Sequence, residues 1–126
     1  MDPYKDTCTT PLEMLYQWNE QVPDRIFLRQ PVNGQYKTYT WSQVNDQARR
    51  LASALLAQGL TKGDRVALLS KNCAEWFISD YAIQLAGLIS VPLYPMQTPD
   101  ALEYVLTHSD SKVIIIGKLD GAKAME

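Results

Sequence analysis

Three short apolar runs constrain the fold of this chain more than any other feature of its 126 residues. They are RVALL at residues 65–69, LISV at 88–91 and KVIII at 112–116. The first is continuously apolar, which predicts a strand covered on both faces, and the last is the most β-prone run in the chain. Helical patterns separate the runs, and this alternation predicts parallel strands with right-handed crossovers. The expected fold class is α/β, a partial doubly wound parallel sheet flanked by helices.

Two helices are expected to connect these strands. The first, over residues 73–86, is apolar nearly all round, including Trp76 and Phe77, so it should be buried, with Asn72 as its N-cap. The second begins at a Thr-Pro pair and covers residues 99–108. Its inward-facing side chains are expected to be Leu102, Val105 and Leu106.

Two further helices are predicted nearer the N-terminus. A capping box of Thr10 and Glu13 begins a helix over residues 11–21. The side chains that it should bury are Leu12, Leu15 and Tyr16, with Trp18 as a further candidate. A second capping box begins a longer helix over residues 41–58. Its apolar stripe consists of Val44, Ala48, Leu51, Ala52 and Leu55.

A β-hairpin is expected between these two helices. Asn33-Gly34 is a strong turn signal between strands at residues 26–30 and 36–40. We therefore divide the chain into residues 1–40, a helix with a hairpin, and residues 41–126, an α/β subdomain with a βαβαβ core. Residues 122–126 resemble the first turn of another helix with no strand after it, so the fold is expected to be an incomplete part of a larger domain.

Composition excludes several classes of function. The net charge of -2 and the pI of about 5.3 give no basic surface for nucleic acid. Cys8 and Cys73 are far apart and His108 is the only histidine, so no metal site is expected. His108 is assigned to a structural position at a helix C-terminus. Neither a signal peptide nor a membrane-spanning run is visible, which favours a cytoplasmic protein with reduced thiols and leaves peripheral membrane contact open.

No catalytic motif stands out. The patterns GxGxxG, GxSxG and HExxH are absent, and the loop at Gly59, Lys62 and Gly63 lacks the spacing of a phosphate-binding loop. We therefore assign no catalytic residue in this sequence.

The stretch LAGLISVPLYPMQTPD, residues 85–100, is the most informative for a site. It leads from a strand end into a Pro-rich loop, where open α/β sheets bind their ligands. Pro92 has no N–H, so the ladder should end there or leave that position on an unpaired edge.

Three runs resemble one enzyme family in continuous order from about residue 38 to residue 117. They are TYTWSQVNDQARRLASALLAQGLTKGDRVALL, NCAEWFISDYAIQLAGLISVPLYP and LEYVLTHSDSKVIIIG. These runs resemble the N-terminal region of the adenylate-forming (AMP-binding) acyl-CoA synthetases, and SVPLYP is most similar to the long-chain fatty-acid–CoA ligases.

The resemblance implies a two-step reaction. ATP and Mg2+ activate a fatty acid as an acyl-adenylate, and the CoA thiol then forms the thioester. It also implies that the family's catalytic residues lie beyond Glu126, in the remainder of the synthetase chain. By the same resemblance, Tyr94, Pro95 and Met96 form a loop near the nucleotide end of CoA, where an aromatic ring could stack on adenine. The alternative is that Tyr94 and Pro95 only pack the sheet edge.

We therefore expect an N-terminal fragment of a long-chain fatty-acid–CoA ligase that is inactive alone and binds no cofactor tightly. The alternative is a stand-alone module that binds a nucleotide or CoA or docks a partner. Its unfinished sheet and apolar helices would favour a homodimer. A flavodoxin-like signalling domain is a third reading, but the chain lacks the clustered acids of such receivers.

Overall fold

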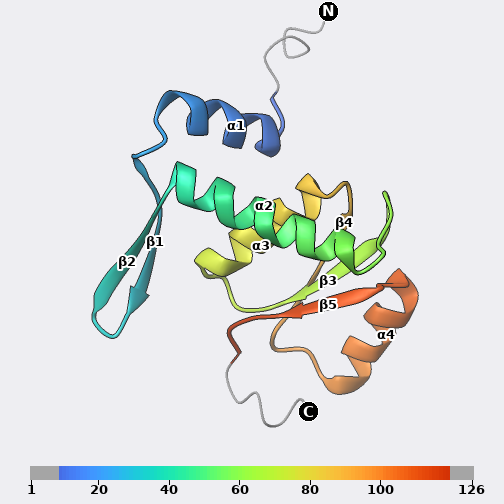
Figure 1. The fold of residues 1–126 in the computed structure, drawn as a ribbon. Coiled ribbons are helices and arrows are strands. Elements are labelled where there is room, and N and C mark those ends of the chain that lie inside the picture. The colour runs from blue at the N-terminus through green and yellow to red at the C-terminus, as the bar shows by residue number, and fades with distance from the viewer. Residues whose placement is uncertain (1–8, 120–126) are drawn as a thin grey trace, which may run out of the picture. The chain divides into compact units, whose positions relative to one another are not determined.

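The computed structural model describes residues 9–119 (Figure 1). The chain divides into two compact units, Met1–Asp46 and Gln47–Glu126. Cys8 and the helix start predicted at residues 122–126 lie outside the described residues.

The first unit begins with α1, Pro11–Gln21. Its capping box forms as predicted: the Glu13 N–H donates to Thr10 Oγ1 at 3.2 Å, and the Thr10 N–H donates to the Glu13 carboxylate at 2.7 Å. Leu15 is fully buried, but Tyr16 is exposed, so its predicted inward position is wrong. The physical reason is that consecutive helical residues point about 100° apart, so Leu15 and Tyr16 cannot both face the same narrow side.

The hairpin of the first unit consists of β1, Ile26–Val32, and β2, Gln35–Thr40, which pair antiparallel. Asn33 and Gly34 both have positive φ, at 50° and 77°, as a two-residue hairpin turn of type I′ requires. Each strand is longer than predicted, because the ladder continues to the turn through residues 31, 32 and 35. Pro31 is tolerated since a two-stranded hairpin has only edge strands.

Helix α2, Trp41–Ala57, begins in the first unit and continues into the second. Its start is a capping box, in which the Gln43 N–H donates to Thr40 Oγ1 at 3.1 Å and the Thr40 N–H donates to Gln43 Oε1 at 2.9 Å. The predicted apolar stripe is confirmed at its buried members, Val44, Ala48, Ala52 and Leu55.

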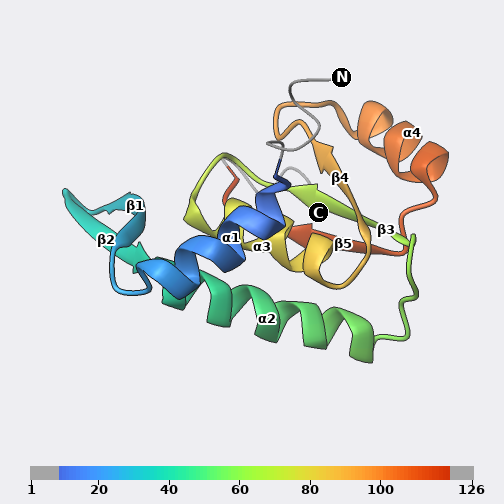
Figure 2. The same cartoon turned by 90° about the horizontal axis from the view of Figure 1, so that it is seen from above.

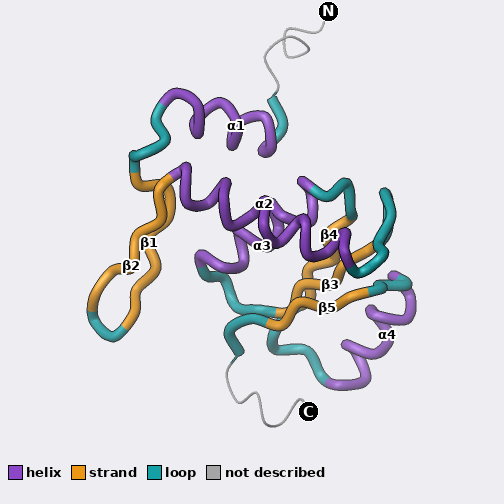
Figure 3. The backbone as a smooth tube through the Cα atoms, viewed as in Figure 1, coloured by secondary structure: helices purple, strands orange, loops and turns teal. Residues whose placement is uncertain are grey.

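The second unit contains a three-stranded sheet (Figure 3). Its strands are β3, Arg65–Leu69, β4, Ile89–Leu93, and β5, Val113–Ile116, in the order β4-β3-β5. Both pairings are parallel. Helix α3, Ala74–Leu85, connects β3 to β4, and helix α4, Pro99–Ser109, connects β4 to β5. The predicted fold class, a partial parallel α/β sheet preceded by a helix and a hairpin, is confirmed.

Helices cover both faces of this sheet (Figure 2). On the face of α2 and α3, the buried cluster consists of Leu55, Leu60, Val66, Ile83 and Leu88. On the opposite face, Ala67, Leu69 and Leu93 are buried against apolar side chains that include Leu102, Val105 and Leu106 of α4. Since α3 and α4 lie on opposite faces, the sheet is doubly wound, as the alternation of elements predicted.

Helix α3 differs from its prediction in two respects. Its N-cap is Cys73, which makes no side-chain cap bond, so the expected cap at Asn72 is wrong by one residue. Phe77 is exposed although Ile78, beside it in sequence, is buried. An almost uniformly apolar sequence hides which side of a helix faces the sheet, and α3 is buried along one side only.

Strand β4 passes through Pro92 to Leu93, further than the expected residues 88–91. Pro92 lies opposite Leu68 in the ladder with β3. Among the described residues no strand pairs with the other side of β4, so Pro92 lies on an edge strand. Of the two predicted outcomes, the unpaired edge is confirmed and the end of the ladder is not.

The centre of β3 provides a test of this core. Leu68 is 1% exposed, and we expect Leu68→Ala to lower the free energy of unfolding by about 2–5 kcal/mol, because truncation leaves a cavity between packed layers. Leu56→Ala on α2 is the matched control: at 47% exposure it should change stability by less than about 0.5 kcal/mol. Urea denaturation measures both. Equal losses in the two variants would contradict the assignment of β3 to the core.

Candidate functional site

The carboxyl ends of β3, β4 and β5 form one edge of the sheet, because Leu69 lies in register with Leu93 and with Ile116. The segments after these strands therefore emerge at this edge. From β3 the chain goes to β4 on one side and then returns past β3 to β5 on the other side, so the strand order reverses at the β3–β5 boundary, which makes this boundary a topological switch point. Open α/β sheets bind ligands at such points.

Ser70 ties the two segments at the switch point together. Its buried hydroxyl donates to the Lys71 carbonyl at 2.8 Å and accepts from the Lys118 N–H at 3.0 Å. The Lys71 N–H donates to the Lys118 carbonyl at 2.8 Å. A Cβ on Gly117 would lie 2.5 Å from Ser70 Oγ, so only glycine fits there. Protein groups thus fill the boundary between β3 and β5.

This arrangement gives Ser70 a structural role. Its contacts are with two backbone groups and with Cys73 Sγ at 3.7 Å, and none is a general base. His108 lies in the last turn of α4, stacked on Tyr104 with ring centroids 5.7 Å apart. Helix α4 leads back to the N-terminal end of β5, so His108 lies toward the N-terminal ends of the strands. Ser70, in contrast, lies at their carboxyl ends.

The segment after β4 contains the three candidate residues, Tyr94, Pro95 and Met96. It is a turn closed at both ends by Gln97, whose N–H donates to the Tyr94 carbonyl at 3.2 Å and whose Oε1 accepts from the Tyr94 N–H at 3.3 Å. Tyr94 is 73% exposed and Met96 is exposed as well, whereas Pro95 is half-buried. The ring of Tyr94 therefore projects from the sheet edge with its faces accessible.

Among the titratable groups of residues 9–119, Tyr81 has a pKa that its surroundings clearly shift. Burial, followed by the charge of neighbouring Asp80, raises the pKa of the Tyr81 phenol, so Tyr81 stays neutral at physiological pH. Across residues 9–119, no three His, Cys, Asp or Glu side chains gather into a set that could bind a metal ion. None of the helices in this part of the chain combines the length and apolarity needed to cross a bilayer.

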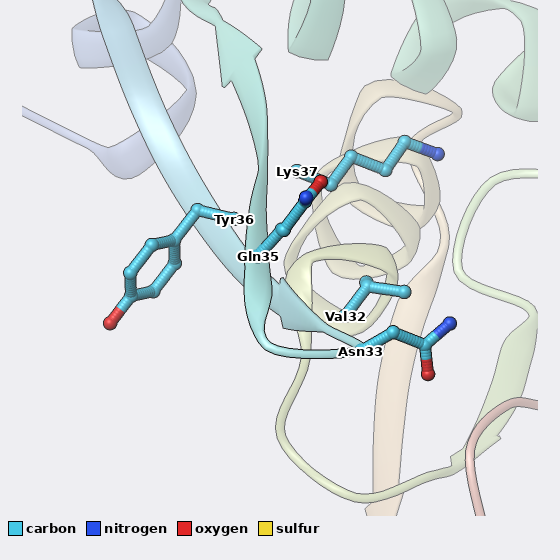
Figure 4. Close-up of a pocket in the computed structure, with 5 residues that line it drawn as sticks. All are labelled: Val32, Asn33, Gln35, Tyr36 and Lys37. Atoms are coloured by element: carbon cyan, nitrogen blue, oxygen red, sulfur yellow. The ribbon is translucent and has the colours of Figure 1, made fainter.

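Surface hollows among the described residues lie elsewhere, and two of them are the larger ones. One, of about 430 Å³, is lined by residues of the hairpin turn and β2, where Figure 4 shows Tyr36 pointing to the opposite side from Val32 and Lys37. The Lys37 ammonium lies 5.2 Å from the centroid of the Tyr39 ring. The other, of about 510 Å³, is lined by side chains of α2 and α3: Gln47, Arg50, Leu51, Glu75, Ile78 and Ser79.

Comparison with known proteins identifies the family. The model of the AMP-binding enzyme family matches residues 15–126. Fatty acyl-CoA synthetase A of Dictyostelium discoideum is 37% identical over 91 residues, which are 72% of this chain and 14% of that protein. A long-chain-fatty-acid–CoA ligase of Mycobacterium bovis is 28% identical over 112 residues, 89% of this chain and 18% of that protein.

A solved structure shows the same fold. The fatty acid AMP ligase from Legionella pneumophila superposes with a TM-score of 0.79 at 24% identity, over 92% of this chain and 21% of that one. The chain thus spans between 14% and 21% of the length of these three proteins.

Gly117 tests the close packing at the switch point. We expect Gly117→Ala to destabilise the fold by about 1–3 kcal/mol, because the new methyl group would overlap Ser70 Oγ and Cβ. In a Ser70→Gly background, which removes both atoms, the same substitution should cost less. Denaturant unfolding of the four proteins gives the coupling energy. Additive effects would contradict direct contact between residues 70 and 117.

Proposed function

The chain belongs to the AMP-binding enzyme family, and from that premise we propose that it is the N-terminal part of an ATP-dependent long-chain fatty-acid–CoA ligase. The observation that carries the proposal is the family match, which covers residues 15–126. The relatives named above as fatty acyl-CoA synthetase and long-chain-fatty-acid–CoA ligase support the substrate class.

The described residues favour a scaffold role for this segment. Acyl-adenylate formation needs groups that bind triphosphate and a divalent metal ion, and residues 9–119 contain no cluster of metal-ligating side chains. ATP, Mg2+ and the fatty acid are therefore assigned to the remainder of the synthetase chain, and the segment alone is proposed to be inactive.

CoA is the substrate for which this segment offers a contact. The accessible ring of Tyr94 could stack against adenine, and stacking of a base on an aromatic side chain contributes about 1–3 kcal/mol. The turn closed by Gln97 fixes the backbone of Tyr94 and so limits the entropy lost on binding. We therefore propose that Tyr94, Pro95 and Met96 form the CoA-side loop.

Titration calorimetry with CoA tests this loop. We expect weak, saturable binding that Tyr94→Ala reduces by about tenfold or more, because the stacking surface is lost. Tyr104→Ala is the control, since Tyr104 is equally exposed but lies on α4, and it should bind CoA as the unchanged chain does. Absence of binding at millimolar CoA, or equal loss in both variants, would remove the loop assignment and leave the family assignment untouched.

Pyrophosphate exchange tests the scaffold role. With ATP, Mg2+ and a long-chain fatty acid, the 126-residue chain should give no exchange above a blank, because the described residues contain no metal-ligating cluster. A full-length family member serves as the positive control. Exchange that is abolished by heat denaturation of the chain would overturn the proposal.

A further inference from the structure

A third hollow lies in the first unit, between the end of α1 and the start of α2. It has a volume of about 240 Å³ and is lined by Trp18, Val22, Arg25, Ile26 and Trp41. Figure 1 shows how these segments meet: the chain turns from the end of α1 into β1, and β2 returns it to the first turn of α2. The lining contains no residue of the CoA-side loop, so the hollow is a separate feature of the chain.

Backbone hydrogen bonds hold the walls of this hollow in place. The Val22 N–H donates to the Trp18 carbonyl at 2.8 Å, and the Arg25 N–H donates to the Val22 carbonyl at 3.1 Å. The Trp41 N–H in turn donates to the Arg25 carbonyl at 3.1 Å, which joins the turn after α1 to the first residue of α2. A ligand would therefore enter a site that is already formed, and binding would order little additional backbone.

Aromatic rings make up much of the wall. The Trp18 and Trp41 rings have centroids 6.2 Å apart and are tilted by 31°. Trp41 is also stacked on Phe27, with centroids 3.7 Å apart, so one face of its indole is covered and its ring is held in position. The register of the hairpin shifts at Phe27, and irregularities of this kind re-aim side chains. The hollow thus offers a fixed aromatic wall beside the aliphatic side chains of Val22 and Ile26.

Arg25 is the charged member of this lining. Within residues 9–119 its guanidinium has no hydrogen bond, ion pair or ring contact. The neighbouring Asp24 is exposed and does not line the hollow. An apolar hollow beside an unpaired guanidinium is complementary to an anion, and the fork of guanidinium N–H groups matches a carboxylate.

The volume limits the size of the ligand. Pockets for drug-sized ligands usually measure roughly 300–1,000 Å³. At about 240 Å³ the hollow is smaller, so a nucleotide or CoA does not fit within it, whereas a single ring does.

We propose that this hollow binds a small aromatic carboxylate, a single planar ring that carries one carboxylate group. The ring lies against Trp18, Val22 and Ile26, and the carboxylate accepts hydrogen bonds from Arg25. This binding site goes beyond the proposed ligase role and does not depend on it.

NMR of the three indole N–H groups, with benzoate as the probe, tests the proposal. We expect benzoate to shift the Trp18 and Trp41 signals saturably, with a dissociation constant in the millimolar range, because so small a ligand makes few contacts. Trp76 of α3 lies outside the hollow, and its signal should not move. Equal shifts of all three signals, or no saturation at tens of millimolar benzoate, would overturn the proposal.

A pair of arginine variants tests the role of the charge. Arg25→Gln should raise the dissociation constant for benzoate by about tenfold or more, because a charge-assisted hydrogen bond is lost. Arg29→Gln is the matched control: Arg29 is an exposed arginine of β1 that does not line the hollow, and its variant should bind benzoate as the unchanged chain does. Equal losses in the two variants would contradict a carboxylate contact at Arg25.

Two further ligands test the chemical class on the unchanged chain, so this readout does not depend on the folding of any variant. Benzamide keeps the aromatic ring without the charge, and cyclohexanecarboxylate keeps the charge without the aromatic ring. Each should bind about fivefold or more weakly than benzoate, because each loses one of the two contacts. If either ligand binds as well as benzoate does, the site does not select an aromatic carboxylate and the proposal is wrong.

Discussion

The pairing of β3 on both sides is the interaction on which the second unit depends. Val66, Ala67 and Leu68 are buried, and their backbone lies between β4 and β5. Leu68 is in register with Pro92 and Ile115, so this one strand sets the positions of both neighbours. The helices that cover the sheet are tethered to the ends of these strands. The position of every loop at the carboxyl ends of the strands therefore depends on β3.

This constraint explains why the candidate site is a loop on a rigid edge and not a pocket. The loops after β3 and β5 are fastened together by Ser70 and by the close approach of Gly117, which fills the switch point with protein groups. The loop after β4 does not share these bonds, and its Tyr94 ring is left exposed. An accessible ring on a fixed backbone suits one contact of a larger binding site, which agrees with a chain that spans a small part of its relatives.

The sequence was informative wherever local chemistry decides structure. The apolar run at residues 66–69, the Asn33-Gly34 turn and the missing N–H of Pro92 each predicted a feature that the structure has. The predictions failed where the burial of a side chain depends on which side of its helix faces the rest of the protein. Phe77 and Tyr16 are apolar residues beside buried ones, and only the position of their neighbours leaves them exposed.

The candidate site also has one part that the sequence predicted and another part that it did not. The loop after β4 could be found from a strand that ends in proline-rich sequence, but its exposure could not, since an aromatic ring there can either pack or project. The contact between Ser70 and Lys118 joins residues 48 positions apart and has no pattern in the sequence. The available signal was a serine and a glycine placed directly after two strands, which becomes meaningful only when the strands are known to be neighbours.

The central claim is that this segment is a scaffold whose carboxyl edge presents Tyr94 to CoA. Amide chemical shifts recorded by NMR during a CoA titration test it most directly. The account predicts saturable shifts confined to residues 94–98 and to the neighbouring segments after β3 and β5. Shifts centred on the hairpin of β1 and β2 or on the hollow between α2 and α3, with residues 94–98 unchanged, would contradict it.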